Sequence, residues 1–132
     1  MAFLSWEGPN GPWDGMWLYA DTNDVRADHN NADTDWKHCG KALVEQMRNL
    51  CLEKFCCGDN NDGTKDVRLA TCSNGKKEQE WDLRKVGNYY QIKNLDENCC
   101  LDVYAGDPTP DQMDVDCESC DSSNTDQLWT KY

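Results

Sequence analysis

The sequence has no long apolar run and few basic residues for its size. Nothing in its 132 residues approaches the ~18 consecutive apolar residues that a membrane-spanning helix needs, so membrane insertion is not expected. The chain carries 13 basic and 25 acidic residues, which gives a formal net charge of −12. Such a surface repels phosphate backbones and anionic lipid headgroups, so nucleic acid and membrane surfaces are not expected as partners.

Signatures of metal binding and catalysis are also missing. Cys117 and Cys120 form one Cys-x-x-Cys pair, but no second pair follows at the spacing of a zinc site. The Asp- and Asn-rich segment 58–63 begins with a glycine where an EF-hand has its first ligand, so it is interpreted as a solvated turn. Neither His29 nor His38 stands in a local signature of a nucleophilic site. The sequence therefore predicts no metal, no cofactor and no enzymatic activity.

Cysteine, by contrast, is plentiful. Nine cysteines in 132 residues are typical of a domain held by disulfides in an oxidising compartment. The count is odd, so at least one thiol is free or pairs with another chain. The cysteines favour an extracellular or secreted location, which is the one expected here. Met1 to Pro9 lacks the features of a signal peptide, so the cytoplasm is the alternative.

Three tryptophans recur at a nearly constant interval. Trp36, Trp81 and Trp129 are separated by 45 and 48 residues. Three units are too few for a β-propeller, which needs about four or more blades. Each unit contains short runs with alternating apolar positions, separated by Gly, Asn, Asp and Pro, as expected for four short β-strands. The stretch from Lys41 to Leu52 also suits a helix, but its flanks match strand runs of the third unit, so it is predicted as strand.

The second and third units align in detail. Cys51-Leu52-Glu53 of the second unit matches Cys100-Leu101-Asp102 of the third. The run from Val67 to Cys72 likewise matches the run from Val115 to Cys120, and in both units the last cysteine precedes the tryptophan by nine residues. Agreement at several offsets argues for a true internal repeat.

The first unit is a degraded copy. The second and third units close on Gln-x-Trp, beginning at Gln79 and Gln127, whereas the first closes on Trp36 without the glutamine. Residues 16–19 and 25–27 stand for its second and third runs. Neither run carries a cysteine at the matching position.

A Cys-Leu-Asp-Val segment, a Val-x-Leu-x-x-Cys segment and a closing Gln-x-Trp, set in a threefold repeat, resemble the ricin-type lectin family. The resemblance is best from Lys41 to Tyr132. It implies an all-β fold over residues 1–132: a single β-trefoil of three lobes with pseudo-threefold symmetry, stabilised by disulfides. The lobes are expected at about 1–38, 39–85 and 86–132, with their tryptophans packed into a shared core.

The resemblance also implies a disulfide within each of the last two lobes. The expected pairs are Cys51–Cys72 and Cys100–Cys120, each closing a loop that stabilises the fold by roughly 3 kcal/mol. Cys117 falls where the family has a buried apolar residue, so it is predicted to be a free thiol in the core. The pairing of four further cysteines is left open: Cys39, Cys56, Cys57 and Cys99.

The resemblance further implies a sugar site in each competent lobe. In family members that bind galactose-type sugars, an Asp accepts hydrogen bonds from two hydroxyls and an aromatic ring covers the pyranose. An Asn or Gln just before the tryptophan completes the polar set. The third lobe matches best, with Asp102 as the acceptor, and its other candidates are Tyr104, Asp116, Glu118, Asp126 and Gln127. Glu118 stands at the aromatic position but cannot stack, so Tyr104 is the expected substitute.

The other two lobes match less well. The second lobe has Glu53 as acceptor and Ala70 at the aromatic position, with Phe55 and Gln79 as further candidates. In the first lobe, Tyr19 stands where the acidic acceptor is expected. Purely structural roles are also open, namely turn capping for Asp102 and hydrogen bonding within its own lobe for Gln127.

The predicted function is therefore that of a non-enzymatic carbohydrate-binding protein. It is expected to recognise glycans of the galactose or N-acetylgalactosamine type through its third lobe. One site binds weakly, so multivalency through a homodimer is a natural expectation. The alternative is a β-trefoil that binds proteins, for example a protease inhibitor, with degenerate sugar sites.

Overall fold

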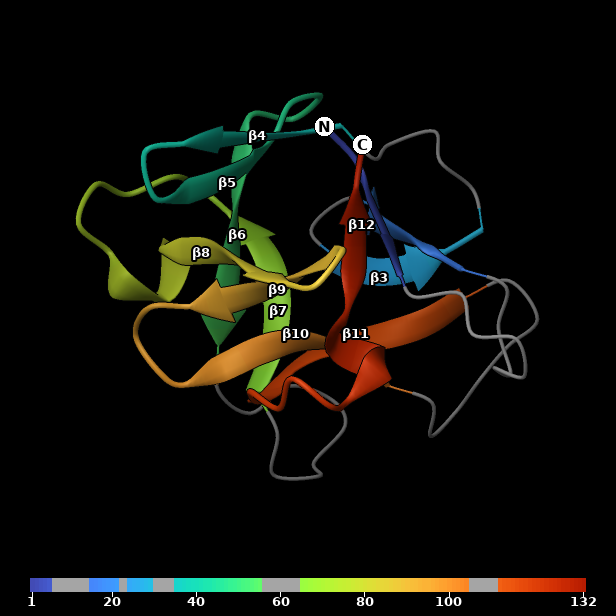
Figure 1. Ribbon diagram of the computed structural model, residues 1–132. Helices are drawn as coiled ribbons and strands as arrows, with labels where there is room; N and C mark the ends of the chain where they lie inside the picture. The colour runs from blue at the N-terminus through green and yellow to red at the C-terminus, as the bar shows by residue number, and fades with distance from the viewer. Residues whose placement is uncertain (6–14, 22–23, 30–34, 56–64, 105–111) are drawn as a thin grey trace.

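The computed structural model describes residues 1–5, 15–21, 24–29, 35–55, 65–104 and 112–132. This part of the chain forms a sheet of twelve strands and two short 3₁₀ turns (Figure 1). It contains no helix long and apolar enough to cross a membrane. The elements are β1 (Phe3–Ser5), β2 (Trp17–Asp21), β3 (Asp24–Asp28), β4 (Trp36–Cys39), β5 (Ala42–Glu45), β6 (Leu50–Phe55), β7 (Lys65–Ala70), η1 (Lys77–Gln79), β8 (Trp81–Val86), β9 (Tyr89–Asn94), β10 (Cys99–Tyr104), β11 (Gln112–Ser119), η2 (Thr125–Gln127) and β12 (Trp129–Lys131).

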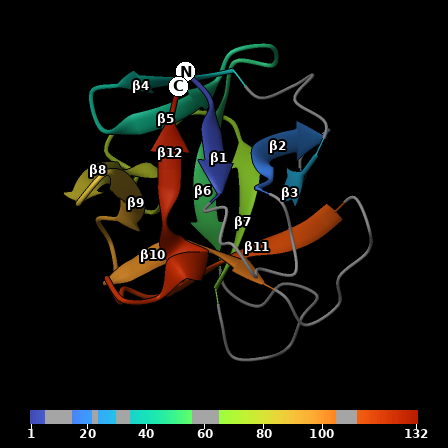
Figure 2. The ribbon, with the colours of Figure 1, turned by 45° about the vertical axis from the view of Figure 1, so that its right-hand side comes forward.

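The strands form one antiparallel sheet, and the two ends of the chain lie side by side in it. Eleven strands run in the order β10-β9-β12-β1-β2-β3-β11-β7-β6-β5-β4, and β8 lies off this path, paired with β9. An additional pairing of β10 with β11 closes part of the path in the manner of a barrel. Figure 2 shows β12 beside β1, with both termini at the same end of the molecule. The backbones of Ala2 and Tyr132 exchange hydrogen bonds of 2.9 and 2.8 Å. The first and third lobes are thereby joined through the chain ends.

The core repeats one arrangement three times. Trp36, Trp81 and Trp129 are 0 %, 1 % and 0 % exposed. A buried indole N–H needs an acceptor, and in each lobe that acceptor is the carbonyl oxygen of a fully buried leucine. The three bonds are Trp36 to Leu18 at 3.1 Å, Trp81 to Leu52 at 2.9 Å and Trp129 to Leu101 at 3.3 Å. The tryptophans that mark the period of the sequence therefore anchor the core of each lobe.

The stretch from Lys41 to Leu52 is a hairpin, as predicted, and not a helix. Strands β5 and β6 are joined by a turn in which the carboxylate of Glu45 accepts hydrogen bonds from the backbone nitrogens of Met47 and Arg48, both at 2.9 Å. Asn49 then adopts a left-handed conformation with φ of 56°, which asparagine tolerates better than most residues. These local bonds reverse the chain between β5 and β6.

Two disulfides lie at the expected positions. Cys51–Cys72 and Cys100–Cys120 join equivalent residues of the second and third lobes, at sequence separations of 21 and 20. With the third bond described next, they are typical of a protein that folds in an oxidising environment.

The prediction of a free thiol at Cys117 was wrong, because Cys117 is bonded to Cys99. Both side chains point into the core from the neighbouring strands β10 and β11, and their Cα atoms are 5.2 Å apart, within the range of a disulfide. In the described part of the chain, the free cysteine is Cys39, which is exposed. Cys56 and Cys57 lie outside the described residues, as does the whole segment 58–63 that was interpreted as a turn.

Candidate functional site

Asp102 is a buried carboxylate on the outer side of β10. Its neighbours Leu101 and Val103 belong to the core, so alternation along the strand directs Asp102 to the opposite face. Only 4 % of its surface is exposed, because η2 lies against β10. Directly across on β11 stands Asp116.

Two amides beside η2 hold this carboxylate. Asn124 Nδ2 and Gln127 Nε2 donate to Asp102 Oδ2 at 3.1 and 3.2 Å. Asn124 also caps η2, since its side-chain oxygen accepts a hydrogen bond from the backbone of Asp126 at 3.0 Å. Sequence analysis missed Asn124, although an Asn three residues before the Gln-x-Trp glutamine is a recognisable capping residue. One residue thus both orients the acid and fixes the turn above it.

Gln127 serves the fold as well as the site. Its Nε2 also donates to the carbonyl of Ser119 at 2.9 Å, and its Oε1 accepts from the backbone of Asp121 at 2.9 Å and from Gln91 Nε2 at 3.3 Å. With the bond to Asp102, both donors and both acceptor positions of the amide are used inside the protein. Gln127 therefore positions Asp102. It also has the structural role considered in the sequence analysis, namely hydrogen bonding within its own lobe.

The environment of Asp102 favours its protonated form. Burial and the charge of Glu118 raise its pKa to about 7, the hydrogen bond from Gln127 opposes this, and the charge of Asp126 adds to it. Glu118 also hydrogen-bonds the Asp102 carboxyl group. Burial raises the pKa of Asp126 in turn. Carboxyl groups this close cannot all ionise without repulsion, so Asp102 is only partly ionised near neutral pH.

The remaining third-lobe candidates differ in how accessible they are to a ligand. Glu118 is half-buried and lines a pocket of about 510 Å³ together with Asn124 and Gln127. Asp116 is fully buried, so a ligand cannot contact it without rearrangement. Tyr104 ends β10, but its side chain lies outside the described residues.

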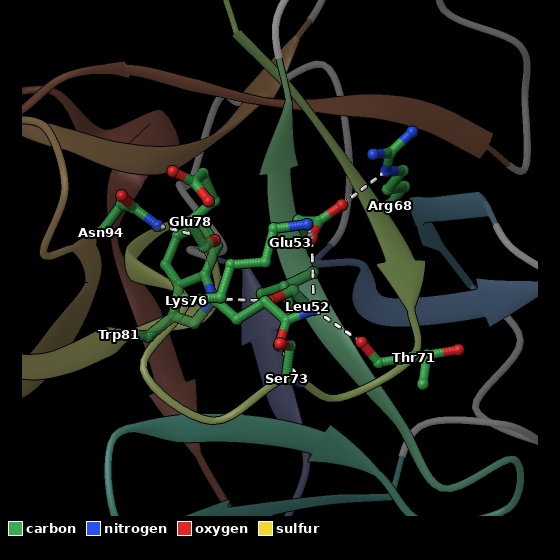
Figure 3. A network of polar contacts seen from close by, with 10 residues as sticks. Leu52, Glu53, Arg68, Thr71, Ser73, Lys76, Glu78, Trp81 and Asn94 are labelled. Atoms are coloured by element: carbon green, nitrogen blue, oxygen red, sulfur yellow. Dashed lines mark hydrogen bonds and ion pairs between the residues drawn. The ribbon is translucent and has the colours of Figure 1, made fainter.

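In the second lobe, the acid at the matching position is paired with cations of the same lobe. Glu53 on β6 is 1 % exposed and receives Gln79 Nε2 and Lys76 Nζ on Oε1, at 3.1 and 2.5 Å. Arg68 Nε reaches its other oxygen at 2.7 Å. Figure 3 shows the Lys76 and Arg68 side chains approaching Glu53 from two sides. Burial opposes ionisation of Glu53, but the hydrogen bonds and charges of Lys76 and Arg68 outweigh it and lower its pKa.

The rest of the second-lobe site repeats the third. Gln79 Nε2 donates to the carbonyl of Thr71 at 2.9 Å, and its Oε1 accepts from the backbone of Ser73 at 2.8 Å, as Gln127 does with its own lobe. A pocket of about 510 Å³ also lies beside Gln79 and is lined by Lys76, but it is formed with residues 39–42, whereas residues 97–99 and 117–121 contribute to the third-lobe pocket. The Arg68 guanidinium lies over one face of the Phe55 ring, 4.6 Å from its centre.

The first lobe has no acid at this position. Tyr19 on β2 is 9 % exposed, and the guanidinium of Arg26 lies 4.9 Å from its ring centre. Arg26 in turn pairs with Asp28 at 3.0 Å. A stacked phenol cannot accept two hydroxyl hydrogen bonds as a carboxylate does.

Comparison with known proteins agrees with this threefold design. The model of the ricin-type beta-trefoil lectin domain matches residues 20–129. The chain belongs to this family. Membership of the ricin-type lectin family indicates carbohydrate binding, and its domains are typically non-catalytic. The resemblance inferred from Cys-Leu-Asp-Val and Gln-x-Trp is thus confirmed.

Solved structures of ricin-type and related trefoils show the same fold. The designed threefold-symmetric protein ThreeFoil is 20 % identical with a TM-score of 0.70, over 98 % of this chain and 95 % of that one. The cytolethal distending toxin of Actinobacillus actinomycetemcomitans is 23 % identical with a TM-score of 0.70, over 97 % and 88 %. A mosquitocidal holotoxin is 19 % identical with a TM-score of 0.72, over 98 % of this chain but 16 % of that one. No curated protein matched the sequence. These likenesses confirm the predicted all-β trefoil.

Proposed function

We propose that this ricin-type domain is a non-enzymatic lectin that binds glycans ending in galactose or N-acetylgalactosamine through its third lobe. The observation that carries the proposal is the buried Asp102 carboxyl group, held in one orientation by Asn124 and Gln127, which themselves line a pocket. A fixed carboxylate makes strong, directional hydrogen bonds to a pair of sugar hydroxyls without losing side-chain freedom on binding. Tyr104 is the proposed stacking ring.

The other lobes are poorer candidates. Lys76 and Arg68 already bind the acceptor Glu53, so a sugar would have to displace charged partners. Tyr19 offers no carboxylate in the first lobe. A single working site is weak, and the proposal therefore includes a homodimer that raises the effective affinity.

The three disulfides among the described residues indicate an oxidising setting, and we propose that the protein acts outside the cell. The proposed lobes are those expected from the repeat, at about 1–38, 39–85 and 86–132. Each carries one of the three buried tryptophans.

A broad glycan array tests the proposal. Wild-type protein is expected to bind glycans with terminal galactose or N-acetylgalactosamine, and Asp102→Ala is expected to abolish this binding. Glu53→Gln, at the matching position of the second lobe, should bind as wild type does. Folding of each variant is checked by near-ultraviolet circular dichroism of the buried tryptophans.

The other outcomes are equally informative. Binding that survives Asp102→Ala would move the site to the first or second lobe. Silence across the array from a folded protein would contradict the lectin proposal and favour a protein-binding trefoil, such as a protease inhibitor.

A further inference from the structure

Lys54 is a buried cation at a position that the repeat assigns to the core. It follows Glu53 on β6 and corresponds to Val103 of the third lobe, which is a core residue. The Lys54 side chain is nevertheless only 5 % exposed, and lysine is rarely buried unless it is paired. A charge at this position breaks the pattern that the third lobe follows, and such breaks are expected where function requires them.

The partners of Lys54 belong to the third lobe. Its Nζ lies 2.8 Å from Asp96 Oδ2 and 2.9 Å from Glu97 Oε1, both in the turn between β9 and β10. Burial opposes ionisation of Lys54, but the hydrogen bonds and charges of these two carboxylates outweigh it and raise its pKa. Lys54 therefore stays charged and ties the tip of a third-lobe turn to the second lobe.

That turn forms one wall of the third-lobe pocket. Residues 97–99 line the same pocket of about 510 Å³ as Asn124 and Gln127, the two amides that hold Asp102. The matching turn of the second lobe is fixed from within its own lobe, through the Glu45 carboxylate. The pocket wall of the third lobe is instead held by a side chain of its neighbour.

Stability alone explains this pairing poorly. Removing an ammonium group from water opposes folding, and replacing a buried ion pair by apolar side chains is often neutral or stabilising. The Asp96 and Glu97 side chains are 35 % and 47 % exposed, so water can hydrate both if Lys54 is replaced. What the protein would lose with Lys54 is the fixed position of the turn.

We propose that Lys54 is a positioning residue of the third-lobe glycan site: it holds Glu97 at the pocket wall, where the Glu97 carboxylate accepts a hydrogen bond from a sugar hydroxyl. A carboxylate has about four lone-pair sites, so Glu97 can bind Lys54 and a hydroxyl together. The bond to the sugar is charge-assisted and gains from an acceptor fixed in advance. This inference rests on the proposed function, because it adds a residue of the second lobe to the same site.

The effect of Lys54 on affinity is measured separately from its effect on stability. Galactose is titrated into wild-type protein and Lys54→Met near neutral pH, and dissociation constants are read from amide shifts by NMR. Lys54→Met should bind galactose at least about fivefold more weakly, while its midpoint of urea unfolding stays at or above that of wild type. Lys85→Met removes the same charge from an exposed position on β8 and should keep the wild-type affinity.

A double variant tests whether Lys54 acts through Glu97. Glu97→Gln should weaken galactose binding about as much as Lys54→Met does. The variant with both substitutions should bind no more weakly than either single variant, because the two residues act as one unit. The Glu97 side chain is half-exposed, so Glu97→Gln still decides the outcome if Lys54→Met fails to fold.

The contrary results are distinct. Wild-type affinity in folded Lys54→Met, or in Glu97→Gln, would overturn the inference and leave the proposed lectin function standing. Losses that multiply in the double variant would also overturn it, since Lys54 would then act by another route. A lower urea midpoint with unchanged affinity would assign Lys54 to stability alone. Failure of wild-type protein to bind galactose or any other glycan would remove the proposed function and the inference with it.

Discussion

The second and third lobes share a scaffold and differ in the charge that it carries. Both close on a buried tryptophan bonded to a leucine carbonyl, and both have a disulfide at the same positions and a glutamine that bridges the same turn. Their acids nevertheless have opposite pKa shifts, lowered for Glu53 and raised for Asp102. The comparison shows that the residues that build a lobe and those that set its chemistry are separate, so one can change without the other.

The largest predicted effect tests whether the two scaffolds are equivalent. Trp81→Ala and Trp129→Ala should each lower the free energy of unfolding by about 3–5 kcal/mol, since each leaves a large cavity in the core. Urea-induced unfolding followed by circular dichroism measures the loss. Met47→Ala, at a side chain that is 68 % exposed, is the control and should change stability by less than about 0.5 kcal/mol. A large effect in only one lobe would show that the scaffolds are not equivalent.

The next prediction concerns pH and separates the two acids. Folded Asp102, with its pKa near 7, keeps a proton that the unfolded chain releases near the usual value of 3.8. The contribution of Asp102 to stability is therefore fully present below its usual pKa of 3.8 and is lost as pH rises through about 7. Between pH 5 and pH 8 wild type should lose about 2 kcal/mol more than Asp102→Asn does.

Glu53 supplies the matched control for that experiment. Its pKa is lowered, so its contribution to stability is present above its usual value of 4.5 and is lost only as pH falls below it. Glu53→Gln should therefore leave the change between pH 5 and pH 8 as it is in wild type. Equal slopes for wild type and Asp102→Asn would show that Asp102 does not retain its proton.

A third prediction replaces two core residues of the third lobe by their equivalents in the second lobe. Cys99 and Cys117 of the third lobe correspond to Leu50 and Leu69 of the second. Replacing both cysteines by leucine removes a disulfide that spans 18 residues. The free energy of unfolding should fall by about 1–3 kcal/mol, because packing of the leucines offsets part of the lost cross-link. Urea unfolding gives the difference. No loss would mean that the extra bond is redundant with the Cys100–Cys120 disulfide.

The smallest prediction contrasts the two acids by direct substitution. At pH 8, Glu53→Gln should destabilise the protein by about 1–2 kcal/mol, because Lys76 and Arg68 lose a charged partner. Asp102→Asn should instead be neutral or stabilising at that pH, because it removes a repelled negative charge. Thermal unfolding at pH 8 measures both, and loss of stability in both would contradict the contrast.

Much of the fold was readable from local pattern. The spacing of Trp36, Trp81 and Trp129 predicted three lobes, and alternating apolar positions predicted the strands, because side chains along a strand alternate between core and outer face. The same pattern resolved the stretch from Lys41 to Leu52 correctly. Alignment of the repeat also located the two equivalent acids.

The site was only partly predictable, because its contacts join residues far apart in the chain. Asn124 reaches Asp102 across 22 residues, and Lys76 reaches Glu53 only because η1 folds back over β6. Neither contact has a periodic signal, and the charge of Lys76 against the neutral amide of Asn124 decides whether a lobe neutralises its own acid.

The sequence by itself determined the threefold repeat, the three tryptophans of the core and the position of an acid in two lobes, since each of these depends on spacing along the chain. The tertiary structure alone decided that Cys117 pairs with Cys99 and that Glu53 is bound by cations of its own lobe while amides hold Asp102. Those outcomes depend on which side chains meet across strands and turns, and on how far burial shifts the balance of their charges.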